Sequence, residues 1–394
     1  MAFYLGNLRN LLMIISHIIL KNWRNFLSVD VELGDRVFVV GPNACGKSNF
    51  LDVFRFLRDI AKPGGGLQTA VRDRGGVSKI RCLSARQNPK IEIEVHLSDY
   101  SSHEPIWKYA IGITQQTRGY RQPILAYERV WKGNVNLIDR PDQNDEKDEL
   151  RRTQTHLEQI SANADFREIT KFFESVLYLH LVPQLLRYPD AFSGPGVSED
   201  PFGRSFLERI TKTPEKTRKS RLTKIENALR SDVPQLKRLT DTKDEMGVPH
   251  LEAVYEHWRP KAGKQREDQF SDGTLRLIGL LWSLLETDSL LLLEEPELSL
   301  NAAIVKKLPS LMYRIQRQKK RQIILTTHSA DLLEDEGIGL EEILLLTPSP
   351  EGTNVIQASS LDNVRDLLDG GLNVAEAVLP LTKPSEINQL ELQL

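Results

Sequence analysis

The stretch Gly41-Pro42-Asn43-Ala44-Cys45-Gly46-Lys47-Ser48 decides the fold of this 394-residue chain. It has the form G-x-x-x-x-G-K-S. The apolar run Arg36–Val40 comes directly before it, and Asn49–Leu57, which has the pattern of a helix, directly follows it. A strand, a glycine-containing loop and a helix in this order are the context in which the pattern binds phosphate groups. We therefore expect residues 41–49 to bind a nucleoside triphosphate.

Each residue type in this loop has a chemical reason. Glycine at positions 41 and 46 lets the backbone curl so that its N–H groups point at phosphate oxygens. Lys47 brings a positive charge to the β and γ phosphates, the Ser48 hydroxyl is a ligand for Mg²⁺, and the helix N-terminus adds a favourable dipole. A chance glycine turn before a helix is the alternative, and the Lys47-Ser48 pair argues against it.

The composition is that of a soluble globular protein, with 40% hydrophobic and 27% charged residues. The length allows two or three domains, or one large domain with an inserted subdomain. A net charge of −2 argues against a generally basic surface for nucleic acid, although it leaves room for a local basic patch. Cys45 and Cys82 do not make a disulfide framework, which fits a reducing cytosol, so we expect a cytoplasmic protein.

The apolar segment Leu11–Leu20 predicts a buried strand, because β-branched residues dominate it. It is far shorter than the roughly 20 residues that a membrane helix needs. No small-residue cleavage site follows it, as a signal peptide would require. We therefore expect no membrane partner. Met13 is an alternative to Met1 as the start of translation, and the sequence leaves the two open.

Further strands are expected in the first half of the chain. Alternating apolar and polar residues predict a half-buried strand at Leu27–Leu33. Turn signals and alternation predict an antiparallel layer made of Ile91–Leu97, Lys108–Thr114 and Ile124–Val130.

The domain organisation follows from changes in composition along the chain. The polar, mostly acidic stretch Pro141–Glu149 predicts a solvated linker or loop, and residues 201–245 are charged with helical spacing. We expect an N-terminal lobe at 1–185, a helical insertion or lid at 186–250 and a C-terminal lobe at 251–394.

The run Leu290–Leu293 followed by Glu294, Glu295 and Pro296 predicts a central strand that ends at a site. At the C-terminal edge of a parallel sheet such carboxylates face the phosphate loop. We expect Glu294 to hold Mg²⁺ through water, and Glu295 to orient or deprotonate the attacking water. An exposed acidic turn after a buried strand is the alternative.

Two more segments carry candidate site residues. The apolar strand Ile323–Thr327 ends at His328, which is placed to reach the γ phosphate and sense its loss, a capping or core histidine being the alternative. Upstream, Ser271 predicts a helix cap, and Gly273 permits close approach of another backbone. An ordinary capped helix is the alternative there.

Five segments in this order resemble those of ATP-binding-cassette (ABC) ATPases of the RecF, SMC and OLD group. More narrowly, the chain resembles stand-alone AAA-family ATPases of the AAA-21 type. The segments are His17–Phe26, Gly41–Asn49, Ser271–Gly273, Glu294–Glu297 and Thr327–Ser329. The resemblance covers nearly the whole chain and implies an α/β fold, the P-loop NTPase fold of an ABC-ATPase head with an antiparallel β layer and an inserted helical subdomain.

The resemblance also implies an ATPase that works as a homodimer or higher oligomer with ATP and Mg²⁺ between two heads. Ser271, Asp272 and Gly273 of one head would then contact the ATP held by the phosphate loop of the other. It places Gln184 as a contact to Mg²⁺ or water, with a surface glutamine as the alternative. Arg72 and Arg74 are candidates to approach phosphates or DNA, and solvated loop arginines are the alternative.

Three features depart from the family pattern. Glu294 stands where aspartate is usual, and its extra methylene should push the metal contact outward. Asp272 and Thr274 stand where transporter ATPases have glycine and glutamine. Leu298–Asn301 matches the dimer loop only loosely, which puts signalling across the dimer there in doubt.

The resemblance also bears on partners. OLD-type proteins carry a nuclease domain after the ATPase, whereas the stretch after His328, with Leu344–Pro348 as its expected last strand, is too short for one. We therefore expect a separate effector, a nuclease or toxin as in anti-phage systems. Basic residues within 204–224 and 314–321 are candidate DNA contacts, and solvated helix faces are the alternative.

Other functions stay open at this point. The chain could be a DNA maintenance ATPase similar to RecF or SMC, or a nucleotide-dependent scaffold with almost no turnover. A transporter's nucleotide-binding subunit is disfavoured, because the strand-rich stretch before Gln184 is too long and Gly41-Pro42-Asn43 resembles the DNA-linked group.

Overall fold

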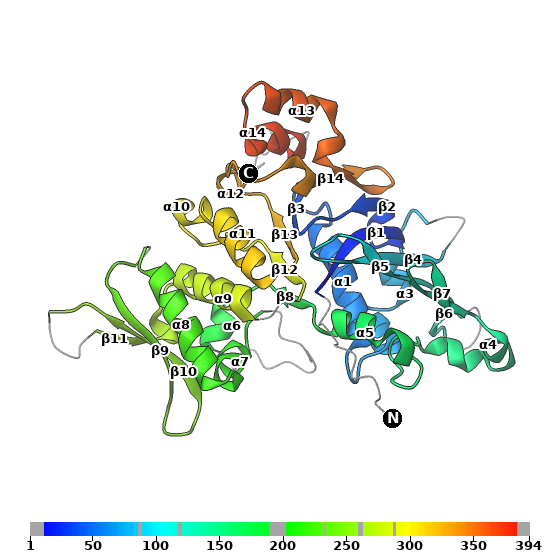
Figure 1. Cartoon of the computed structure of the whole chain (residues 1–394), viewed down its shortest axis with the longest axis horizontal. Coiled ribbons are helices and arrows are strands. Elements are labelled where there is room, and N and C mark those ends of the chain that lie inside the picture. The colour runs from blue at the N-terminus through cyan, green and yellow to red at the C-terminus, as the bar shows by residue number, and fades with distance from the viewer. Residues whose placement is uncertain are drawn as a thin grey trace, which may run out of the picture.

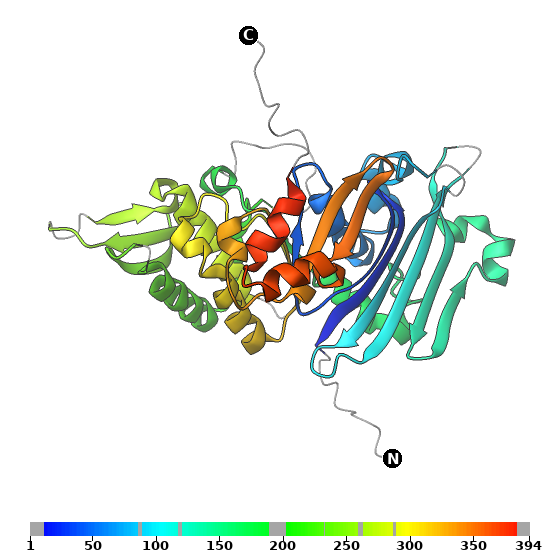
Figure 2. The same cartoon turned by 90° about the horizontal axis from the view of Figure 1, so that it is seen from above.

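The computed structural model describes residues 12–85, 89–116, 120–188, 202–231, 233–258, 263–286 and 289–383. Two six-stranded sheets, with helices between and around them, form the larger part (Figure 1). A smaller unit of helices and a three-stranded sheet lies at one end of the molecule. One of the two six-stranded sheets, which is antiparallel, lies at the other end (Figure 2). The predicted α/β fold class is confirmed.

The first six-stranded sheet carries the phosphate loop. Its strand order is β15-β14-β3-β13-β12-β8, and all neighbours run parallel except β14 and β15. The strands are β3 (Arg36–Val40), β8 (Leu177–Leu179), β12 (Leu291–Glu294), β13 (Ile323–Thr327), β14 (Ile343–Ser349) and β15 (Gly352–Gln357).

Both faces of this sheet are buried, which explains its nearly continuous apolar runs. Val37 and Val39 of β3 belong to one hydrophobic core, whereas Phe38 and Val40 belong to another. Helix α1 (Lys47–Ala61) contributes to the first core. Helices α9 (Asp272–Glu286) and α11 (Leu308–Lys319) contribute to the second.

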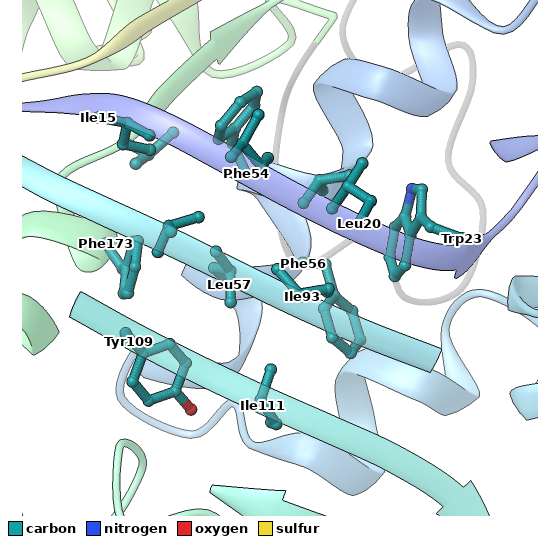
Figure 3. Close-up of a cluster of buried hydrophobic side chains, with 14 of the residues drawn as sticks. Ile15, Leu20, Trp23, Phe54, Phe56, Leu57, Ile93, Tyr109, Ile111 and Phe173 are labelled. Atoms are coloured by element: carbon teal, nitrogen blue, oxygen red, sulfur yellow. The ribbon is translucent and has the colours of Figure 1, made fainter. Parts of the chain in front are cut away.

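The second six-stranded sheet is entirely antiparallel and has the order β2-β1-β4-β5-β6-β7. Its strands are β1 (Met13–Trp23), β2 (Phe26–Glu32), β4 (Ile91–Asp99), β5 (Pro105–Gln115), β6 (Pro123–Lys132) and β7 (Val135–Arg140). Phe54 and Leu57 of α1 face Ile93 and its neighbours on this sheet (Figure 3). Helix α1 is therefore held between the two sheets, and this fixes the loop from which it starts.

The smaller unit overlaps the segment 186–250, where a helical insertion was expected, and extends beyond it on both sides. It contains α6 (Pro183–Arg187), α7 (Phe206–Lys212) and α8 (Glu215–Leu229), followed by β9 (Leu236–Lys243), β10 (Pro249–Tyr255) and β11 (Lys264–Arg266). The helical expectation for 201–245 is therefore wrong from Leu236 onward. Leu236 and Leu239 are both buried and three residues apart, a spacing that also suits a helix, but antiparallel pairing with β10 makes the segment a strand.

Two other expectations need correction. The acidic stretch Pro141–Glu149 contains α4 (Gln143–Lys147), and Asp145 is buried in an ion pair of 2.8 Å with Arg140 instead of being solvated. Leu344–Pro348 lies within β14 but is not the last strand, because β15 pairs with it as a hairpin. In both places a contact with another part of the chain decides the structure.

The remaining helices are short. They are α2 (Leu67–Arg72), α3 (Val77–Ile80), α5 (Arg167–Glu174), α10 (Ala302–Val305), α12 (Ala330–Leu333), α13 (Asp362–Asp369) and α14 (Val374–Val378). In the part of the chain that the structure describes, no helix is both long and apolar enough to cross a membrane.

Candidate nucleotide-binding site

The phosphate loop connects the end of β3 to the start of α1. At its two glycine positions there is no space for a side chain. A Cβ atom at Gly41 would lie 2.7 Å from both the Cys45 Sγ and the Leu346 carbonyl oxygen. Gly46 has a φ of +100°, in the left-handed region, and a Cβ there would clash with the Asn25 side chain. The loop therefore has the tight backbone that the sequence pattern predicts.

Lys47 lies at the first position of α1 with its ammonium group turned back over the loop. The residue is only 7% exposed. Its Nζ donates hydrogen bonds to the Gly41 carbonyl at 3.0 Å and to the Pro42 carbonyl at 3.2 Å. These are weak acceptors compared with a phosphate oxygen, so the charge is positioned to exchange them for an anionic ligand.

Two side chains from distant hairpins hold the loop from outside. The Cys45 carbonyl oxygen accepts a hydrogen bond from Asn25 Nδ2 at 2.7 Å and another from Thr353 Oγ1 at 2.8 Å. Asn25 Oδ1 also accepts from Asn49 Nδ2 at 2.8 Å. Asn25 lies in the β1–β2 turn and Thr353 in β15, so both sheets contribute to the position of the loop. Sequence reasoning missed Thr353, which is 308 positions from Cys45.

Ser48 and Glu294 meet directly, as expected from the topology. The Ser48 hydroxyl donates to one carboxylate oxygen of Glu294, at the end of β12, and the Tyr178 hydroxyl of β8 donates to the other. Burial and the neighbouring Glu294 carboxylate raise the pKa of Tyr178 well above its ordinary value, so the phenol stays a donor. The guanidinium of Arg55 lies 4.2 Å from the Tyr178 ring centroid. Tyr178 is a second residue that sequence reasoning missed.

Ser48 and Glu294 have the chemistry of magnesium ligands. A hydroxyl and a carboxylate are the hard oxygen donors that Mg²⁺ prefers, and it usually takes its other ligands from water and nucleotide phosphates. No group of three His, Cys, Asp or Glu side chains that could hold a metal by itself occurs among the described residues.

Glu295 and His328 lie side by side at the ends of neighbouring strands. The distance from His328 Nδ1 to Glu295 Oε1 is 3.2 Å, and their side chains are 50% and 23% exposed. Glu295 has a φ of +44°, and its N–H donates to both the carbonyl and the hydroxyl oxygen of Thr326, at 3.1 and 3.2 Å. The backbone thus turns sharply after β12 and leaves this carboxylate accessible to water, with an imidazole beside it.

Glu297 lies close to this pair and is a residue to which the sequence reasoning gave no role of its own. Its Oε1 accepts a hydrogen bond of 2.6 Å from the Thr327 hydroxyl, which itself accepts one of 3.0 Å from the N–H of Ser329. The second oxygen, Oε2, is buried without a hydrogen-bond partner among the described residues. Burial raises the pKa of Glu297 above its ordinary value. A third acid, directly after Pro296, was the available signal in the sequence.

The segment Ser271–Gly273 lies at the start of α9. The Ser271 hydroxyl oxygen accepts from the Thr274 N–H at 3.1 Å, so Ser271 caps the helix as expected. A Cβ at Gly273 would lie 2.6 Å from the Ser299 carbonyl oxygen, which confirms a close backbone approach and identifies the partner as the loop after β12.

The contact that the structure gives Gln184 is with Asp272. Its side-chain N–H donates to Asp272 at 3.2 Å, and Arg187 forms an ion pair of 2.7 Å with the same carboxylate. Among the described residues Gln184 makes no hydrogen bond to Ser48 or Glu294. In this arrangement its amide holds Asp272, and the metal role remains a prediction.

The arginines and lysines proposed as phosphate or DNA contacts are mostly engaged within the chain. The Arg74 side chain is only 7% exposed and pairs with Asp52 at 2.8 Å and Asp59 at 2.9 Å. Arg72, which is exposed, pairs with its neighbour Asp73. In the basic stretches, several side chains have internal partners: Lys212 with Glu208, Arg218 with Asp241, Lys219 with Glu215, Arg221 with the Glu286 carbonyl, and Arg321 with the Ser283 and Ser289 carbonyls.

Comparison with known proteins gives a family and similar structures. Residues 36–334 match the family model AAA_21, described as "AAA domain, putative AbiEii toxin, Type IV TA system". The SMC head domain from Thermotoga maritima is similar, with a TM-score of 0.45, 12% identity and coverage of 87% of this chain and 98% of that chain. A second similar structure is the Smc head domain from Pyrococcus furiosus, with an extended coiled coil and bound to the C-terminal domain of ScpA. Its TM-score is 0.48 and its sequence identity 14%, and the match covers 91% of this chain and 99% of that chain. No curated protein matches the chain in sequence.

Proposed function

Because the chain belongs to the AAA_21 family, whose model matches well over half of it, we propose that it hydrolyses ATP and thereby controls a separate effector. The effector would be a nuclease or toxin, and the biological role anti-phage defence. One observation carries the ATPase part of this proposal. Lys47, Ser48 and Glu294 converge at one edge of the parallel sheet, and Glu295 and His328 stand beside them as an accessible acid–base pair.

Each of these residues has a definite task in this chemistry. Lys47 binds the β and γ phosphates in place of the two loop carbonyls that it contacts now. Ser48 and Glu294 would hold Mg²⁺, which when bound neutralises charge on the phosphates. Glu295 orients the attacking water and accepts its proton, and His328 at 3.2 Å fixes the orientation of that carboxylate. Tyr178 keeps Glu294 from turning away through its hydrogen bond.

We further propose that two copies pair head to head around ATP. The support is that Ser271 is exposed, and that Asp272 and Gly273 contact Gln184, Arg187 and the Ser299 loop and not the phosphate loop. Family resemblance implies that such a segment completes the nucleotide site of a second copy. The site would then be complete only in the dimer.

The variant Glu295→Gln tests hydrolysis and pairing together. An amide cannot accept the proton, so we expect phosphate release to fall by about 100-fold or more while ATP binding is retained. Size-exclusion chromatography with light scattering should then show an ATP-dependent dimer that persists. Unchanged phosphate release would mean that Glu295 is not the base, and a monomer at saturating ATP would remove the pairing model.

A DNA maintenance ATPase remains the second candidate, although Arg218 and Arg221 of its proposed contact surface are already engaged within the chain. Stimulation of the ATPase by duplex DNA, falling steeply with salt, would favour it. Stimulation that is absent, or unaffected by salt, would leave the effector model as the one to pursue.

A further inference from the structure

A groove runs along the surface between α8, α9 and α11. It consists of two hollows of about 520 and 260 Å³. Both are lined by Ala228, Leu281, Leu311 and Arg314, so they form one continuous groove. It lies apart from the phosphate loop and from the Glu295–His328 pair, none of which lines it. Figure 1 shows the three helices next to one another.

The floor and walls of the groove are apolar. Each of the three helices contributes residues at helical spacing, so that one stripe of each faces the same hollow. The stripes are Ile225 and Ala228 on α8, Leu277, Leu281 and Leu285 on α9, and Leu308, Leu311 and Ile315 on α11. Ala228, Leu285, Leu311 and Ile315 are only partly buried, so the three stripes are not fully covered by one another.

The rim of the groove is cationic. Lys224, Lys307 and Arg314 line it and are exposed. None of the three forms an ion pair within the described part of the chain. Their neighbours differ: Lys219 pairs with Glu215 on the same helix, and Lys306 pairs with Glu334 at 2.7 Å. No carboxylate is present among the described residues that line the groove. The apolar floor is therefore flanked by positive charge that the chain itself does not neutralise.

We propose that this groove binds an amphipathic helix of a partner protein, with an apolar face and acidic residues on both flanks. The complementarity is twofold: apolar side chains would cover the floor, and carboxylates would meet Lys224, Lys307 and Arg314. The dimensions suit a short helix, because α11 rises by about 16 Å between Lys307 and Gln318, or roughly three helical turns.

The position of the groove connects it to the nucleotide site. One end is lined by Asn301, the cap of α10, and Asn301 is two residues after Ser299, whose carbonyl approaches Gly273. A helix bound there lies beside the loop that contacts the start of α9. The inference deepens the proposed function, since this partner would be the effector. It is tested without ATP, so its failure would leave the ATPase proposal standing.

The test uses a labelled synthetic peptide and the full-length protein. The peptide has 14 residues, leucines at every third or fourth position and glutamates on both flanks, and a second peptide carries lysines in place of the glutamates. Fluorescence anisotropy should show binding of the glutamate peptide that weakens with salt, and at least tenfold weaker binding of the lysine peptide. The double variant Lys307→Glu/Arg314→Glu should reverse this preference. Lys216→Glu, an equally exposed change on α8 outside the groove, should not.

Three results would overturn the proposal. The first is equal binding of both peptides, and the second is an unchanged preference in the double variant. The third is a dimer that forms without ATP and that the double variant abolishes, because the groove would then be filled by a second copy. All changed residues are exposed, so folding should be retained, and the circular dichroism spectrum and melting temperature of the double variant serve as the check.

Discussion

The two halves of the candidate nucleotide site differ in how much of their surroundings the chain itself supplies. On the phosphate-loop side, the Cys45 carbonyl is held by Asn25 and Thr353, and Lys47 is nearly buried. On the α9 side, Ser271 is exposed and caps only its own helix. The first half is thus preorganised by the fold. The second half is, in our proposal, completed by a second copy.

The sharpest test of the preorganised half is Lys47→Ala. Removing a charged hydrogen-bond donor worth roughly 3 kcal/mol should weaken ATP binding by about 100-fold. Isothermal titration calorimetry measures this directly. Lys79→Ala, at an exposed residue of the short helix α3, is a matched control and should bind ATP as the unchanged protein does. Equal loss in both variants would point to general destabilisation.

A change at Gly273 should affect the other half alone. In Gly273→Ala the new methyl group would lie 2.6 Å from the Ser299 carbonyl, so the loop after β12 must shift. We expect ATP-dependent pairing and hydrolysis to fall by about tenfold, the effect of a local repacking cost of one to two kcal/mol, while ATP binding stays unchanged. Gly34→Ala is the control, because the nearest atom to a Cβ there is 3.8 Å away. If Gly273→Ala weakened ATP binding as well, the two halves of the site would not act independently.

A similar contrast separates the features that the sequence could predict from those that it could not. The positions of the phosphate loop, Glu294 and His328 were predictable because each comes at the end of a continuous apolar run, and parallel strands bring such ends to one edge. Tyr178 and Thr353 were not, because strand pairing brings them to residues 116 and 308 positions away. Strand β9 was missed for a related reason, since the spacing of Leu236 and Leu239 suits a helix and only the pairing with β10 decides against it.

A smaller effect is expected from a change at Thr353, which helps to hold the phosphate loop in position. Thr353→Val keeps the shape of the side chain but removes the hydroxyl that donates to the Cys45 carbonyl. Asn25 still donates to that oxygen, so we expect only about fivefold weaker ATP binding, or roughly 1 kcal/mol. Thr347→Val in the neighbouring strand β14 is the control. An unchanged affinity in Thr353→Val would show that Asn25 alone holds the loop.

The smallest expected effect comes from a change at Glu297, close to Glu295 and His328, and it depends on pH. Burial raises the pKa of Glu297 above its ordinary value of 4.5, and the Thr327 hydrogen bond offsets only part of this. The folded state therefore prefers the protonated acid, so this stabilisation is complete below pH 4.5 and is lost as pH rises through the raised pKa. Glu297→Gln stays neutral and keeps an acceptor for Thr327. Its melting temperature relative to the unchanged protein should therefore be equal near pH 4 and a few degrees higher at pH 8. A difference that does not vary with pH would mean that folding does not change the pKa of Glu297, and that the orphaned oxygen is solvated in solution.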